Sequence, residues 1–272
     1  MNWLDKKVFL LLGIVFVIGE GLGLLVANNL IALGIKSEPL TGNMNNPLEA
    51  IYLIVIILLM TSLILVLLKY KKQRKFLWLF EFLAVFATGT IVLGSFLPYD
   101  DLLVLAIMII ILAVRYTHRE NIFIRDFVGI IAIAGAGAVI GISFGLIPVI
   151  LFVILLSIYD FIAVFKTKHM VELGKKVTKQ NLAFTIAMPT KKHTFELGNG
   201  DLVIPLIVAS SVFANGFFVN NFLVAILCLI GSFIGLVLSI YIVSTKKIAL
   251  PALPPQTAIM VIIIGLAFLI GL

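Results

Sequence analysis

Two aspartates lie where the sequence is otherwise apolar. Asp160, with Tyr159 beside it, lies within the apolar residues 157–163, and Asp201 ends the glycine-containing stretch 198–201 at the start of the next apolar segment. A carboxylate near the bilayer centre costs about 2.5–3.5 kcal/mol, so such residues face protein or water and are candidates for function. Two carboxyl groups brought to about 3 Å share one proton. Such a pair provides a carboxylate that deprotonates water and an acid that polarises a carbonyl, which is the chemistry of an aspartic protease.

Other ionisable residues suggest weaker alternatives. Glu20 and Glu81 also fall in apolar segments, where a carboxyl hydrogen-bonded between helices, or close enough to the interface to reach water, is the ordinary explanation. A metal site is disfavoured because the three histidines lie in predicted loops, away from both aspartates, and lack the His-x-x-x-His spacing. These histidines are His118, His169 and His193. The sequence therefore predicts chemistry that needs neither a metal nor another cofactor.

The composition places these residues in a membrane protein. Of 272 residues, 62% are hydrophobic and 12% charged, and the mean hydropathy is +1.23. Soluble domains have about 45–50% apolar and about 25% charged residues. A disulfide framework is excluded because Cys228 has no partner, and disordered, fibrous and nucleic-acid-binding classes do not fit this composition. We therefore expect the lipid bilayer, and no nucleic acid, as the environment of this chain.

Apolar runs predict an all-α, polytopic protein with nine transmembrane helices. The predicted spans are residues 8–33, 48–68, 76–97, 102–114, 127–145, 148–165, 202–218, 222–243 and 255–272. Counting loops alternately, every lysine and arginine except Lys36 falls on one side, which predicts a cytoplasmic N-terminus and an extracytoplasmic C-terminus. The basic run at residues 69–75 is then an inside loop rather than a nucleic-acid or acidic-lipid patch, and the first segment a retained span rather than a signal peptide.

The chain is expected to form one transmembrane domain over residues 1–272, interrupted by one polar loop. Spans one to six occupy residues 1–165, the cytoplasmic loop residues 166–197, and spans seven to nine residues 198–272. In the fifth span, Gly137 and Gly141 have the spacing that is typical of close helix packing. Cys228, in the eighth span, is expected to fill the core.

The polar loop is predicted to contain a short interfacial helix and a β-hairpin. The helix is expected at residues 169–174. Residues 181–188 alternate in hydrophobicity with the period of a strand, residues 189–192 form a plausible turn, and residues 194–197 form a second strand. The hairpin would end just before Asp201. An unwound substrate segment needs partners for its backbone, and strand addition to a hairpin edge would supply them.

Prolines interrupt the chain between the eighth and ninth spans. Pro251, Pro254 and Pro255 fall within five residues, and prolines impose irregular, extended backbone where a helix would otherwise begin. Non-helical backbone near membrane depth is buried in protein or lines a watery cavity. Taken alone, the cluster would be an ordinary helix start.

Three ordered motifs together resemble the presenilin and signal-peptide-peptidase family of intramembrane aspartyl proteases. They are Tyr159-Asp160 in the sixth span, Gly198-Asn199-Gly200-Asp201 opening the seventh, and Pro251-Ala252-Leu253 before the ninth. The resemblance implies that Asp160 and Asp201 are the catalytic pair. It also implies that Tyr159, the residues of the glycine motif and Pro251, Ala252 and Leu253 contact substrate.

Within the family, the chain is similar to presenilin rather than to signal peptide peptidase. The N-inside orientation and the sequence of residues 249–254 favour presenilin, and the compact size is similar to that of its archaeal homologues. Asn199 departs from the pattern, because presenilins carry a hydrophobic residue at this position, which is linked in the family to substrate choice. We therefore do not expect the substrate preference of the eukaryotic relatives to transfer.

The leading prediction is an endopeptidase that cleaves within transmembrane segments of membrane proteins or signal-peptide remnants. A prepilin-type peptidase also uses a Gly-x-Gly-Asp aspartate, but it does not explain the proline cluster or nine spans. A proton- or cation-coupled transporter or leak channel would use Asp160 and Asp201 as its relay. That alternative explains the paired carboxylates but gives no reason for the hairpin and the Pro-Ala-Leu segment.

Overall fold

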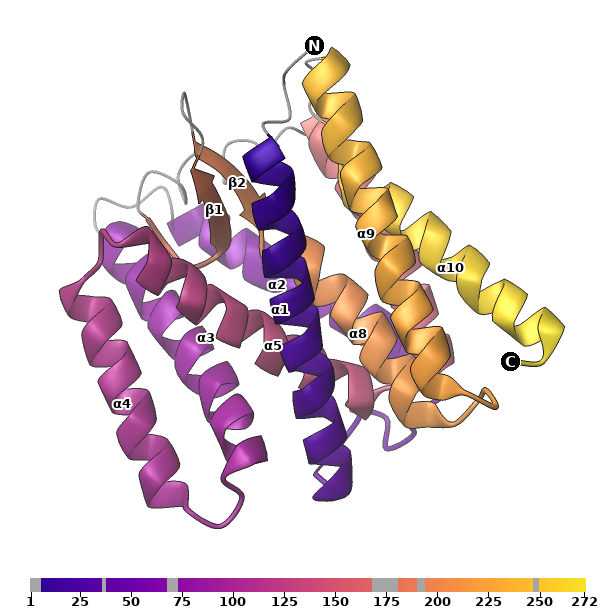
Figure 1. Cartoon of the computed structure of the whole chain (residues 1–272), viewed down its shortest axis with the longest axis horizontal. Helices are drawn as coiled ribbons and strands as arrows, with labels where there is room; N and C mark the ends of the chain where they lie inside the picture. The colour runs from indigo at the N-terminus through magenta and orange to yellow at the C-terminus, as the bar shows by residue number, and fades with distance from the viewer. Residues whose placement is uncertain (1–5, 36–37, 68–72, 168–180, 190–193, 247–249) are drawn as a thin grey trace.

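The computed structural model describes residues 6–35, 38–67, 73–167, 181–189, 194–246 and 250–272 (Figure 1). These residues form nine α-helices, one π-helical turn and two strands. The helices are α1 Lys6–Ala32, α2 Leu48–Leu67, α3 Gln73–Phe96, α4 Asp101–Thr117, α5 Ile122–Ser143, α6 Leu146–Ile162, α8 Gly200–Asn215, α9 Asn221–Lys246 and α10 Leu253–Ile270. The π-helical turn η1, Ala163–Thr167, continues α6, and the strands are β1 Thr185–Pro189 and β2 Thr194–Gly198.

Each predicted apolar span corresponds to one helix, but the start of the fifth was predicted wrongly. The helix α5 begins at Ile122, five residues before the predicted start at residue 127. The reason is a helix cap, because the Asn121 side chain accepts hydrogen bonds from the amides of Phe123 and Ile124. Residues 125 and 126 are therefore helical rather than part of a loop.

Six of the described helices are long and apolar enough to cross a membrane. They are α1, α3, α5, α6, α9 and α10, whereas α2 and α8 offer shorter apolar stretches and α4 has 17 residues. Large apolar side chains cover the outer surfaces, as at Leu102 and Phe123, which are each 83% exposed. Contiguous exposed apolar surface of this kind suits lipid rather than water. Length and composition thus support a multi-pass protein with six crossings, and the count of nine stays a prediction.

Helix α5 packs among its neighbours through its glycines. It packs against α1, α3, α4 and α8 (Figure 1). A Cβ atom added at Gly141 would lie 2.5 Å from Ser210 Cβ on α8, and one added at Gly135 would meet the Thr88 backbone on α3. The close packing predicted for the glycines of this span is confirmed, and it draws α8, which carries Asp201, against α5. Cys228 is fully buried in the core, as predicted.

The predicted hairpin is confirmed. Strands β1 and β2 pair antiparallel, with Ile186 opposite Leu197 and Met188 opposite Phe195. Ile186, Met188 and Leu197 are buried in the main hydrophobic core. The predicted short helix at residues 169–174 and residues 190–192 of the predicted turn at 189–192 lie outside the described residues. The hairpin therefore lies on the helices and ends, at Gly198, two residues before α8 begins.

Candidate active site

Asp160 lies in the last turn of α6. Its side chain is half-buried, as is that of Tyr159, and the helix changes to the π-helical turn η1 three residues later. Single π-helical turns occur frequently at functional sites. A backbone hydrogen bond from Leu253, at the start of α10, reaches the Asp160 carboxyl. The end of α6 and the beginning of α10 thus meet at this aspartate.

Asp201 is the second residue of α8, and its side chain is partly buried. Its carboxyl group interacts electrostatically with that of Asp160. Because α6 ends and α8 begins at the same end of the molecule, with the two helices packed on each other, the aspartates meet despite the loop between them. The structure therefore brings the two predicted catalytic residues together.

The glycines of the Gly-x-Gly-Asp motif are not required for a left-handed backbone, because neither Gly198 nor Gly200 has a positive φ. Among the described residues, a Cβ atom added at Gly198 would lie 3.7 Å from Asp201 Oδ2 and near no other atom, and one added at Gly200 would meet nothing within 4 Å. Gly198 therefore leaves space beside the Asp201 carboxyl in the described part of the chain.

Asn199 ties this motif to the hairpin. Its backbone amide donates to the Phe184 carbonyl at 3.0 Å, and its side-chain Nδ2 donates to the Ala183 carbonyl at 2.8 Å. A hydrophobic side chain at this position would lose the second bond. The polar residue that departs from the presenilin pattern thus fixes the start of α8 to the segment that enters β1.

The Pro-Ala-Leu segment lies directly before and at the start of α10. Pro251 and Leu253 are buried and Ala252 is half-buried, and α10 begins at Leu253 with a proline in its first two positions, which needs no amide donor there. Helix α9 holds this end closely. A Cβ atom added at Gly235 would lie 2.7 Å from the Gln256 backbone nitrogen. The close approach of α9 places the Leu253 amide at Asp160.

We expect the substitution Gly235→Ala to reduce peptidase activity about tenfold to a hundredfold, because a displacement of about 1 Å near reacting groups can cost 10²-fold. The added methyl group would clash with the backbone of Pro255 and Gln256, which must move. This backbone lies two to three residues after Leu253 in the first turn of α10. Gly231→Ala is the matched control on the same helix, since its Cβ meets only side-chain atoms, of Ile259 and Ile263. Cleavage rates of the two variants, normalised to folded protein, test this. Equal cleavage rates in the two variants would contradict the proposed importance of the contact between Gly235 and the start of α10.

Sequence reasoning missed a group of buried polar residues beside the hairpin. Arg115 and Arg125 were assigned to an inside loop as topological charges, but they are helical and only 3% and 1% exposed. Arg115 forms an ion pair with Glu81 at 2.8 Å. The available signals were Glu81, an acid in an apolar segment that requires a partner, and the helix-capping residue Asn121. In contrast, both carboxyl oxygens of the buried Glu20 lack a hydrogen-bond partner among the described residues.

Comparisons with known proteins agree with this geometry. A family model described as signal-peptide peptidase, presenilin aspartyl protease matches residues 13–195. A solved presenilin family intramembrane aspartate protease, in the P2 space group, is similar with a TM-score of 0.70 at 24% identity, over 100% of this chain and 98% of that one. A second such structure, in the C222 space group, gives 0.69 at 22% identity over 96% and 97%. No curated protein matches the chain.

The apolar helices and the fold define a multi-pass, helical membrane protein. Since the family model covers more than half of its length, the chain belongs to the signal-peptide peptidase and presenilin family of intramembrane aspartyl proteases. The match ends before Asp201, and the structural likeness extends the same fold across α8, α9 and α10.

Proposed function

We propose that Asp160 and Asp201 are the catalytic pair that hydrolyses a peptide bond within a transmembrane segment of a membrane protein or signal-peptide remnant. The observation that carries this proposal is the convergence of the two carboxyl groups where α6, α8 and the start of α10 meet.

The reaction needs one ionised and one protonated carboxyl. The ionised carboxyl takes a proton from water as the water oxygen attacks the carbonyl carbon, and the protonated one donates its proton to the carbonyl oxygen. The tetrahedral diol then collapses. The C–N bond breaks, the amine nitrogen receives a proton from the first carboxyl, and the second recovers its own from the diol hydroxyl. All proton transfers are accounted for by the two aspartates and water.

The hairpin offers one strand edge to a substrate. The Ala187 amide donates to Asp126 on α5 at 3.1 Å, so it points away from β2. The Asn199 amide pairs with the Phe184 carbonyl, which places the hydrogen-bonded pairs at 184/199, 186/197 and 188/195. The outer edge of β1 therefore faces α5. On β2, the backbone groups of residues 194 and 198 point to the opposite side, where no third strand pairs among the described residues.

Strand addition to β2 solves the chemical problem of cleavage in a membrane. A helical peptide bond is hydrogen-bonded and shielded, and unwinding it strands backbone groups at several kcal/mol each in an apolar medium. Pairing with β2 would satisfy those groups and extend the substrate. Because β2 ends at Gly198, the extended segment would continue toward Asp201. We propose that β2, with the backbone of residues 251–253 on the other side, clamps the substrate.

We infer the membrane topology from the charges of the loops. All nine described α-helices would cross the bilayer, with the N-terminus cytoplasmic and the C-terminus extracytoplasmic, because every lysine and arginine except Lys36 then lies on the inside. The shorter helices α2, α4 and α8 would cross where the protein itself lines part of their length. This orientation places the hairpin and both aspartates toward the cytoplasmic half.

The purified protein in liposomes should cleave a model single-span substrate, and an aspartyl transition-state analogue should abolish that cleavage. Such analogues bind 10²–10⁸-fold tighter than substrates, so inhibition at low analogue concentration is expected. Product masses and the rate with and without the analogue are measured. Ion flux across the same liposomes, insensitive to the analogue and without any cleavage, would instead favour the transporter or leak channel.

A further inference from the structure

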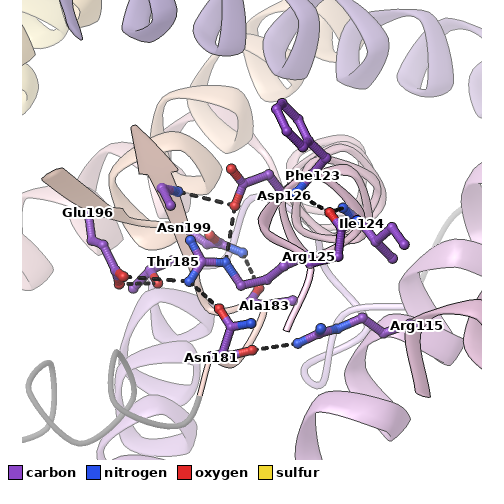
Figure 2. Close-up of polar contacts among 12 residues, drawn as sticks. Arg115, Phe123, Ile124, Arg125, Asp126, Asn181, Ala183, Thr185, Glu196 and Asn199 are labelled. Carbon is purple, nitrogen blue, oxygen red and sulfur yellow. Dashed lines mark hydrogen bonds and ion pairs between the residues drawn. The ribbon is translucent and has the colours of Figure 1, made fainter. Parts of the chain in front are cut away.

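The polar face of the hairpin lies against a cluster of buried and half-buried charged and amide side chains (Figure 2). We call this cluster the hairpin anchor. It consists of Arg125 and Asp126 at the start of α5, Asn181 before β1, and Glu196 on β2. Arg125 is at its centre and is 1% exposed. The opposite, apolar face of the hairpin lies in the main core, so both faces are held.

Each contact of the anchor is directional. Arg125 Nη1 donates to Asn181 Oδ1 at 2.8 Å and lies 3.5 Å from Glu196 Oε1, and Arg125 Nε donates to Asp126 Oδ1 at 3.1 Å. The same Asp126 oxygen accepts the Ala187 amide of β1 at 3.1 Å. Thr185 donates to the other carboxyl oxygen of Glu196 at 2.8 Å. Arg125 thus connects α5 to β2 and to the segment before the hairpin, and Asp126 connects α5 to β1.

A second arginine extends the connection to α3 and α4. Arg115 Nη2 donates to the Asn181 carbonyl at 2.5 Å, and Arg115 Nε pairs with Glu81 on α3. Asn181 Nδ2 donates to the Arg119 carbonyl at 2.6 Å. Asn181 has a φ of 54°, the left-handed conformation that Asn tolerates better than most residues. Its placement is thus fixed by three hydrogen bonds to three arginines, which lie on α4, in the turn after α4 and on α5.

Stability alone does not explain the anchor. Buried ion pairs are frequently no more stabilising than apolar side chains of the same volume, and their best-attested use is to fix one arrangement over others. The apolar contacts of Ile186, Met188 and Leu197 are non-directional. A shift of the hairpin along the helices would instead break directional contacts that cross from α5, namely the Ala187–Asp126 hydrogen bond and the Arg125–Glu196 ion pair. The anchor therefore favours a single position of β2 on the helices.

We propose that Arg125 and Asn181 are positioning residues that set which peptide bond of the substrate is cleaved. They act through β2, because the position of β2 along its own strand direction, relative to Asp160 and Asp201, determines which substrate residue reaches the two carboxyls. This inference rests on the proposed function. The substrate strand pairs with β2 in registers that differ by two residues, since a shift by one residue would turn every substrate side chain to the other face. Loosening the anchor should therefore yield new products cut two residues from the original bond.

The experiment compares product ends by mass spectrometry for wild type, Arg125→Gln and Asn181→Gly. Glycine keeps the left-handed backbone at position 181 without its side-chain bonds. We expect the ratio of shifted to original product to rise about tenfold in both variants, since hydrogen bonds to a charged group are worth roughly 1.5–3 kcal/mol and 1.4 kcal/mol is tenfold. Arg125→Lys should recover part of the original ratio. Should Arg125→Gln fail to fold, Asn181→Gly and Arg125→Lys carry the test.

Arg119→Gln is the matched control. It removes a neighbouring arginine whose side chain contacts Trp78 and Tyr116 but whose only contact with the anchor is through its backbone carbonyl. Its product ratio should equal that of wild type. The overturning result requires that wild type cleaves and that the analogue inhibits this cleavage. If the product ratio is then unchanged in Arg125→Gln and Asn181→Gly while their cleavage rates fall, the anchor is only structural and the inference is overturned. If wild type itself does not cleave, it is the proposed function that fails.

Discussion

Asp160→Asn and Asp201→Asn should each lower cleavage of a single-span substrate by at least about 10³-fold. General acid–base catalysis contributes roughly 10²–10⁴-fold per group, and here each carboxyl serves both as acid and as base within one cycle. Asparagine preserves the size of the side chain and its capacity to accept the backbone hydrogen bond of Leu253, but it cannot exchange the proton. Initial rates of both variants in liposomes, against wild type at the same protein concentration, provide the measurement.

The matched control for these substitutions is Glu20→Gln. It changes a buried carboxyl to an amide in α1 without altering any hydrogen bond among the described residues, because neither oxygen of Glu20 has a partner there. Its cleavage rate should match that of wild type. Cleavage that persists in either aspartate variant would point to a contaminating protease, whereas loss in Glu20→Gln as well would show that any buried carboxyl is needed for folding rather than for chemistry.

The sequence predicted the elements that are determined locally. Apolar runs located all nine helices because a long apolar segment in this composition has no alternative to a membrane or buried helix. Alternation at residues 181–188 predicted β1, since a period of two is unambiguous in a polar loop. The predicted start of α5 was wrong because the predicted span was limited to apolar residues, which excluded Arg125 and Asp126. Asn121 marks the observed start, because its side chain caps the helix.

What the sequence could not supply is the partnership of residues far apart in the chain. Arg115 and Arg125 are of the residue type that is typical of an inside loop. Only the fold shows that they bind Asn181, which is 66 residues from Arg115 and 56 residues from Arg125. Likewise, the space that Gly198 leaves beside Asp201 among the described residues depends on how β2 and α8 are arranged, and the local sequence does not show it. Side-chain pairing across such distances depends on helix packing, which a single sequence does not encode in its local pattern.

Gly198→Val should reduce cleavage by about 10²-fold or more while leaving the protein folded. Among the described residues, the Cβ position of residue 198 has one neighbour, Asp201 Oδ2 at 3.7 Å. Valine also favours a strand, so β2 should form normally. Its two methyl groups would occupy the space through which the extended substrate and the water reach the carboxyl, and a misplacement of about 1 Å at a reacting centre costs 10²-fold.

A graded series separates blocking from unfolding. Gly198→Ala adds only the Cβ atom at an ordinary contact distance and should lose less activity than Gly198→Val, with thermal stability in detergent similar for both and for wild type. Binding of a transition-state analogue should weaken in the same order, since the analogue occupies the same space beside Asp201. Equal activity of all three proteins would mean that the substrate does not pass along the end of β2. The approach to the aspartates would then lie on the side of the Pro251-Ala252-Leu253 segment alone.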